Sequence, residues 1–142
     1  MTATAIDALH DIHTATNDVL KGYREMLERA KVDVQPIIRD LTDMHERHAA
    51  EQQAELSRMR DANKDDSSLQ GTVNKVVVIL RDWISNVDRD VLPAVRDGEE
   101  SLGDQYDKAL EDEEVAAAPG VGLLLRAQQE QITDAISGLP KG

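Results

Sequence analysis

The sequence predicts an all-α protein whose helices pack around one apolar core. Its 142 residues include no Phe, one Trp and two Tyr, so Leu, Ile, Val, Ala and Met have to fill the interior. These side chains favour packed helices over sheets. Apolar residues recur at intervals of three and four through most of the chain, which is the spacing of one helix face. The four prolines occur singly, where they punctuate elements rather than form a linker.

The first two helices are predicted at residues 4–30 and 33–61. Asp33 can cap the second helix, and Pro36 is tolerated in its first turn because the amides there have no partner within the helix. The connection between the two helices is short, so we expect them to be antiparallel neighbours.

Three further helices are predicted in the rest of the chain. A break precedes the fourth helix, because Pro93 removes an amide donor and crowds the preceding turn. The third helix would span on the order of 25 Å, nearly the length of the bundle, at 1.5 Å per residue. In order, we expect a loop at 61–68, a helix at 69–85, a break at 86–90, a helix to 110, a run at 111–114 that leads into a turn region at 116–120, and a helix at 121–137.

The order of these helices predicts a topology. One antiparallel pair, a connection long enough to travel the bundle and a second antiparallel pair is the ferritin-like arrangement, rather than a plain up-down-up-down bundle. The crossover between the two pairs would itself be a helix. We therefore expect residues 1–142 to form a single ferritin-like four-helix bundle domain with a helical crossover, because a second domain has no room.

Three short stretches carry a resemblance to a known family. They are DVLKGYRE at residues 18–25, AEL at 54–56, and RDGEE at 96–100 before a helical run that contains a tyrosine. The chain resembles an uncharacterised family of small bacterial ferritin-like proteins over nearly its whole length, and these three stretches carry the likeness. The resemblance implies a domain of unknown function with a ferritin-like bundle and a role in bacterial stress physiology.

Charge and cysteine content narrow the partners and the location. The chain has 28 acidic and 16 basic residues, a formal net charge of −12, which repels phosphate backbones and anionic lipid surfaces. We therefore expect no nucleic acid and no membrane partner. Residues 1–20 contain no continuous apolar stretch, so we expect neither a signal peptide nor an anchor there. The absence of cysteine suits a reducing compartment, and the expected location is the cytoplasm.

The metal site that ferritin-like topology predicts is incomplete in this sequence. Dinuclear carboxylate proteins of this kind use a Glu from each of two helices and a Glu-x-x-His pair from each of the other two. The fourth helix has Glu99 and Glu100, of which only one can face inward because consecutive helical residues point about 100° apart. The second helix has no Glu-x-x-His pair, the first has Leu20 where a Glu is wanted, and the last has Gln128 and its neighbours instead of histidine.

Histidines in the first two helices form a candidate substitute site. His10 and His13 are three residues apart, as are His45 and His48, and reflecting the helices about their turn puts His13 beside His48. Neutral imidazoles there could bind zinc or another divalent ion. The alternative is that these polar side chains bond to one another and set the register of the helices. The candidate metal ligands are His13, His48 and Glu99, with His45 and Glu51 as second choices, for iron or zinc.

A buried histidine cluster would also make stability depend on pH. Burial lowers the pKa of an imidazole unless a carboxylate is near, because the charged form loses its hydration. We therefore expect thermal stability to fall between about pH 6 and 5.

No complete catalytic constellation is visible in the sequence. Ser85, Ser101 and Ser137 have no histidine at nearby positions, and the glycine turn at 120–122 follows no strand and precedes no P-loop lysine. We expect no catalytic residues and no resident cofactor. The sequence favours a non-enzymatic bundle that acts through self-association as a homodimer, or through another protein partner. The alternative is a metal-binding protein with a histidine site or a degenerate di-iron carboxylate site.

Overall fold

The structure is a computed structural model that describes residues 3–63 and 87–140, and within these ranges the chain is helical apart from turns and one isolated bridge. No described helix is both long and apolar enough to cross a membrane. The described elements are, in chain order, α1 (Ala3–Leu27), α2 (Gln35–Asn63), the 3₁₀ turn η1 (Arg89–Val91), α4 (Leu92–Glu111), α5 (Glu113–Ala117) and α6 (Val121–Ser137).

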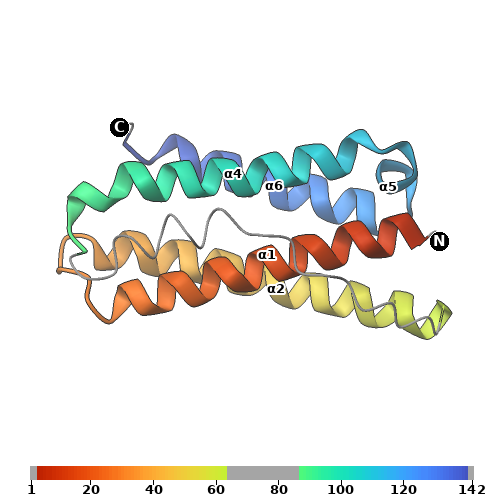
Figure 1. Ribbon diagram of the computed structural model, residues 1–142, viewed down its shortest axis with the longest axis horizontal. Helices are drawn as coiled ribbons and strands as arrows, with labels where there is room; N and C mark the ends of the chain where they lie inside the picture. Colours follow the sequence, from red (N-terminus) through yellow and green to blue (C-terminus); the bar gives the residue numbers. More distant parts are fainter. Residues whose placement is uncertain (1–2, 64–86, 141–142) are drawn as a thin grey trace.

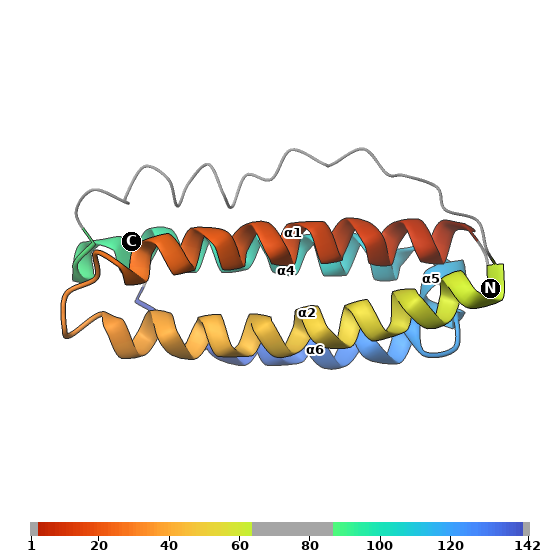
Figure 2. The ribbon, with the colours of Figure 1, turned by 90° about the horizontal axis from the view of Figure 1, so that it is seen from below.

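The four long helices lie side by side in two antiparallel pairs. α1 packs along α2, and α4 packs along α6 (Figure 1). α1 and α4 form one layer, and α2 and α6 form the other (Figure 2). α2 ends at the opposite end of the molecule from the start of α4 (Figures 1 and 2). The crossover helix predicted at 69–85, with Trp83, lies outside the described residues.

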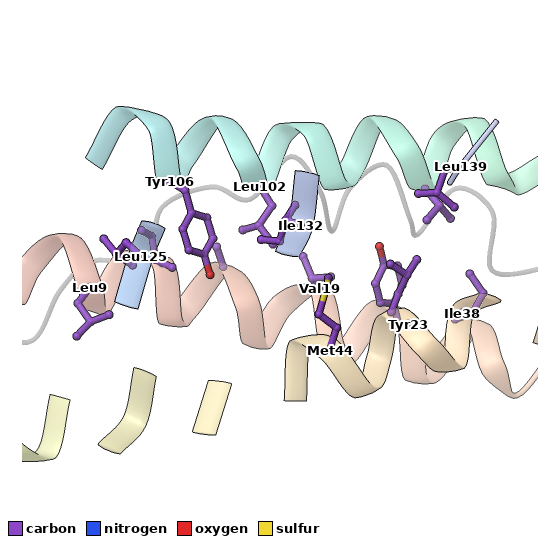
Figure 3. Close-up of a cluster of buried hydrophobic side chains, with 14 of the residues drawn as sticks. Leu9, Val19, Tyr23, Ile38, Met44, Leu102, Tyr106, Leu125, Ile132 and Leu139 are labelled. Atoms are coloured by element: carbon purple, nitrogen blue, oxygen red, sulfur yellow. The ribbon is translucent and has the colours of Figure 1, made fainter. Parts of the chain in front are cut away.

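The apolar stripes expected from the sequence meet in one interior between these helices (Figure 3). Tyr23 and Tyr106 are fully buried there, and aliphatic side chains fill the space around them. Complete burial of an aliphatic side chain contributes about 1.5–3 kcal/mol, so packing of the stripes, more than helix propensity, holds the helices together. The aliphatic residues labelled in Figure 3 are Leu9 and Val19 from α1, Ile38 and Met44 from α2, Leu102 from α4, Leu125 and Ile132 from α6, and Leu139.

The first helix ends earlier than residue 30, where the sequence placed its end. α1 stops at Leu27, and Ala30 instead forms an isolated parallel bridge with Val87. The amide of Lys31 donates to the Val87 carbonyl at 3.1 Å. A segment distant in sequence thus supplies the backbone bonds that another helical turn would have made. Pro36 lies in the first turn of α2, as predicted. α2 ends at Asn63, beyond the predicted end at residue 61.

The segment that joins α4 to α6 contains a short helix, where the sequence analysis predicted only a run at 111–114 and a turn at 116–120. Asp112 caps α5, and its carboxylate accepts a hydrogen bond from the Glu114 amide at 2.9 Å. The acidic residues that follow suit the positive end of a helix dipole. The turn itself is confined to the residues after α5, where Pro119 precedes Gly120 with a φ of 85°. Only glycine adopts that backbone region readily.

Arg96 fixes the C-terminal end of α6 against α4. Its guanidinium donates to the carbonyl oxygens of Ile136 at 2.9 Å and Leu139 at 2.6 Å. The last carbonyls of a helix have no partner within the helix, so this side chain satisfies groups that would otherwise need water. The contact holds the second antiparallel pair in one register.

A glycine at the α5–α6 junction gives the first testable prediction. A Cβ at Gly122 would lie 2.3 Å from the Ala116 carbonyl oxygen, whereas a Cβ at Gly103 would lie 3.9 Å from Ile132 Cγ2. We expect Gly122→Ala to lower the free energy of unfolding by about 1–3 kcal/mol through backbone displacement. Gly103→Ala, the matched control, should be neutral or raise it by up to about 1 kcal/mol. Urea unfolding of both variants checks this; equal effects would contradict it.

Candidate functional site

Polar side chains are buried in the middle of the helices. They come from α1, α2, α4 and α6, and they divide into two groups that we name after their chemistry. The carboxylate cluster consists of Tyr23, His45 and Glu99. The amide cluster consists of Thr16, Gln52, Tyr106 and Gln128. All seven side chains are buried.

In the carboxylate cluster, two donors converge on one oxygen atom of Glu99. The Tyr23 hydroxyl donates a short hydrogen bond to Glu99 Oε2, and His45 Nε2 lies 2.8 Å from the same atom. The side chains of His45 and Glu99 are both completely buried. Glu99 Oε1 has no hydrogen-bond partner in the part of the chain that the structure describes. A buried carboxylate oxygen without a hydrogen-bond partner raises the free energy of the folded state. The unpaired oxygen of Glu99 therefore needs a chemical explanation.

The phenol of Tyr23 is held in its neutral form. Burial raises the pKa of Tyr23 well above its ordinary value, and the adjacent Glu99 carboxylate raises it further by its charge and by accepting a hydrogen bond from the hydroxyl. The hydroxyl therefore serves as a permanent donor to Glu99 at physiological pH.

The two histidines of α2 share one geometric pattern. His45 and His48 are one turn apart, with ring centroids 5.8 Å apart and planes at 82°. His48 Nε2 lies 2.9 Å from the side-chain oxygen of Gln131, just as His45 Nε2 lies beside Glu99. Because oxygen atoms accept at both Nε2 positions, each neutral ring carries its proton there and its Nδ1 keeps a free lone pair. Both Nδ1 atoms are buried and lack partners among the described residues.

Gln52 is the centre of the amide cluster. Its Nε2 lies 3.1 Å from Thr16 Oγ1, 2.9 Å from the Tyr106 hydroxyl and 2.9 Å from Gln128 Oε1. An amide nitrogen has two hydrogens, so these three acceptors share two donated bonds. The Tyr106 hydroxyl donates to Gln128 Oε1 at 2.8 Å, and burial raises the pKa of Tyr106. One side chain of α2 thus reaches a partner on each of the other three long helices.

The amide cluster extends toward the surface on two sides. Gln128 Nε2 donates to Glu51 Oε1 at 2.9 Å and to the His48 carbonyl at 3.2 Å. On the opposite side, Gln52 Oε1 lies 3.0 Å from His13 Nδ1, and His13 Nε2 lies 3.3 Å from Asn17 Nδ2. His13 is half-buried and Asn17 is exposed.

The structure separates the residues that the sequence analysis grouped as metal ligands. His13 lies opposite Gln52, one turn beyond His48, so the reflection of the two helices was wrong by about one turn. His48 bonds toward α6 and Glu99 bonds to Tyr23 and His45, while Glu51 is exposed and bonds to Gln128. Within residues 3–63 and 87–140, no group of three or more His, Asp or Glu side chains is arranged to hold a metal ion.

Other expectations about inward positions agree with the structure. Glu99 is buried and Glu100 is exposed, as the 100° angle between consecutive helical residues requires. Leu20 and Gln128, which occupy the positions where a ferritin-like metal site would have its ligands, are both buried. Tyr23 is the functional residue that sequence reasoning missed. Its signal was a tyrosine within an apolar stripe, since a buried phenol needs a hydrogen-bond partner.

Comparison with known families assigns the chain to one of them. Residues 4–112 match the model of a family described as a domain of unknown function, DUF2383. The chain belongs to this family. No curated protein and no solved structure matches it. The matched part of this DUF2383 chain contains the whole carboxylate cluster and ends before α6, so Gln128 and Gln131 lie outside it.

Removing the central amide of this DUF2383 protein gives the second prediction. Gln52→Ala leaves Gln128, Tyr106 and Thr16 short of a buried partner and opens a cavity, so we expect the free energy of unfolding to fall by about 2–4 kcal/mol. Gln53→Ala is the matched control, because Gln53 is exposed and donates a hydrogen bond to Ser57 on the same helix at 3.3 Å. That variant should stay within about 0.5 kcal/mol of wild type in urea unfolding. Similar losses in both variants would refute a central role for Gln52.

The third prediction concerns pH. Burial lowers the pKa of His48 from its ordinary value, so the unfolded chain takes up a proton at a higher pH than the folded protein does. The stability that neutral His48 contributes is therefore present above about pH 6.5 and is lost as pH falls below it, with a slope of at most about 1.4 kcal/mol per pH unit.

The test compares wild type with His48→Gln by urea unfolding from pH 7.5 to 5 in chelator. The difference in stability should shrink steadily as pH falls. Burial raises the pKa of Asp11, which stabilises the fold at low pH, but this effect is common to both proteins and cancels. Parallel stability curves would rule out His48 as the source.

Proposed function

We propose that this protein is a non-catalytic helical-bundle protein that acts in the cytoplasm through self-association or through another protein. We further propose that residues 1–142 form one ferritin-like four-helix domain with a helical crossover. The positions of the ends of α2 and α4, at opposite ends of the molecule, support that topology.

One observation carries the proposal of a non-catalytic role. The buried polar side chains are used to join helices, since Gln52 alone bonds to partners on α1, α4 and α6. A fully connected polar network of this kind specifies a unique packing of the helices. Because these interior polar groups hold the helices together, we expect the activity of the protein to lie at its surface.

The surface supplies two features for a partner. Val32, between α1 and α2, is 82% exposed, and Leu123, in the first turn of α6, is 73% exposed. The net charge of −12 opposes contact between copies and favours contact with a basic protein. These two kinds of partner differ in how salt affects them, because salt screens both repulsion and attraction between charges.

The fourth prediction tests association by native mass. Light scattering at increasing concentration should give a mass above the 15.7 kDa of the single chain. Salt should promote this self-association by screening like charges. Leu123→Ser should weaken it about fivefold or more, whereas Lys21→Ser, an exposed control on α1, should not. A strictly monomeric protein that also binds no basic protein would overturn the proposal.

Metal binding is the second candidate function, and a specific observation favours it. Glu99 Oε1, His45 Nδ1 and His48 Nδ1 are buried and have no hydrogen-bond partners among the described residues. The ring of His45 contacts Glu99 through Nε2 and lies 5.8 Å from the ring of His48, centroid to centroid. Unsatisfied buried polar atoms in a native structure point to a missing water or ion. Imidazole nitrogens and carboxylates are the common ligands of divalent transition metals.

A further inference from the structure

We propose that His45 and His48 form a two-imidazole site that binds one divalent transition metal ion through their Nδ1 atoms. Glu99 and Gln131 would hold the two rings from the opposite side. The inference rests on the second candidate function and names the donor atoms and the class of ion. It replaces the earlier grouping of His13, His48 and Glu99 as direct ligands.

The tautomers of the two rings are the first argument. Each Nε2 faces an oxygen acceptor, the Glu99 carboxylate for His45 and the Gln131 amide oxygen for His48. In the neutral form of each ring, Nδ1 is therefore the unprotonated nitrogen that a metal requires, and each Nδ1 is buried without a competing donor among the described residues. Metal-binding histidines commonly present one nitrogen to the ion and donate the other N–H to a carboxylate or carbonyl.

The spacing of the rings is the second argument. With metal–nitrogen bonds of about 2.1 Å, two imidazoles on one ion have centroids about 5 to 6.4 Å apart as the angle at the metal opens from tetrahedral to linear. The centroids of His45 and His48 are 5.8 Å apart. The two residues are three positions apart on α2, which places them on one helix face.

The charge of Glu99 is the third argument. A fully buried carboxylate without a fixed cationic partner is expensive. Among the described residues, Glu99 forms hydrogen bonds with Tyr23 and His45, and His45 carries a charge only when it is protonated. A divalent ion bound to Nδ1 of His45 would compensate the negative charge of Glu99, which lies beside Nε2 of the same ring. Glu99 would then raise the basicity of His45, and Tyr23 would fix the orientation of the carboxylate.

The donor set selects the class of ion. Two imidazole nitrogens suit zinc, copper or nickel, whereas magnesium and calcium prefer oxygen ligands. No third His, Asp or Glu in the described residues is arranged around the same point. Water would complete the coordination shell.

The fifth prediction tests the site with zinc. The full chain, purified without an affinity tag, is stripped with chelator and titrated with Zn²⁺ by calorimetry. We expect one Zn²⁺ per chain and a higher melting temperature, with no competition from Mg²⁺. His45→Gln and His48→Gln should each weaken binding at least tenfold, and Glu99→Gln should weaken it about 10- to 100-fold with unchanged stoichiometry. His13→Gln, the matched control, should bind as wild type does.

The outcomes separate the inference from the function on which it rests. If zinc binds in stoichiometric amount but His45→Gln and His48→Gln keep it, the donor set is wrong and metal binding stands. If no stoichiometric zinc binds, both are wrong. Where a variant fails to fold, nitrogen-15 spectra of wild-type histidines decide instead. Zinc should shift the Nδ1 resonances of His45 and His48, and shifts at Nε2 or at His13 would overturn the assignment.

Discussion

The hydrogen bonds of the Gln52 amide are the constraint on which the arrangement of the helices depends. Its nitrogen lies within 3.1 Å of acceptors on α1, α4 and α6, and it is itself completely buried on α2. A buried amide without partners costs about 1–3 kcal/mol, so only a packing that brings all four helices together satisfies it. Apolar stripes alone would tolerate sliding by a helical turn, and this side chain does not.

Glu99 places a second, different demand on the same interior. The polar groups of the amide cluster bond to one another, whereas Glu99 Oε1 and His45 Nδ1 of the carboxylate cluster have no hydrogen-bond partner in the part of the chain that the structure describes. Polar groups that only set the register of helices need not include a charged side chain, because a neutral amide can set the register with a smaller desolvation penalty. The contrast between the two clusters is the physical reason to give the first a structural role and the second a chemical one.

Much of the fold and part of the site could be predicted from the sequence. The spacing of apolar residues located the four long helices, and the histidine pair of the second helix singled out His45 and His48, which are both buried. Helical geometry alone separated buried Glu99 from exposed Glu100. The partners of these residues could not be predicted, because the register between two helices depends on the exact geometry of their turn. The predicted register differs from the observed one by about one turn, so the sequence analysis placed His13 beside His48, whereas the structure places it beside Gln52.

By itself, the sequence determined the helical class, the faces that turn inward, the acidic surface and the absence of thiol chemistry, since each follows from residue type and local periodicity. Only the tertiary structure decided where α1 ends, because Val87 takes the backbone bonds near Ala30. Only the tertiary structure made Tyr23 a hydrogen-bond donor to Glu99. It also left the Nδ1 atoms of His45 and His48 without partners among residues 3–63 and 87–140. These features depend on groups far apart in the chain, whose distances no local pattern encodes.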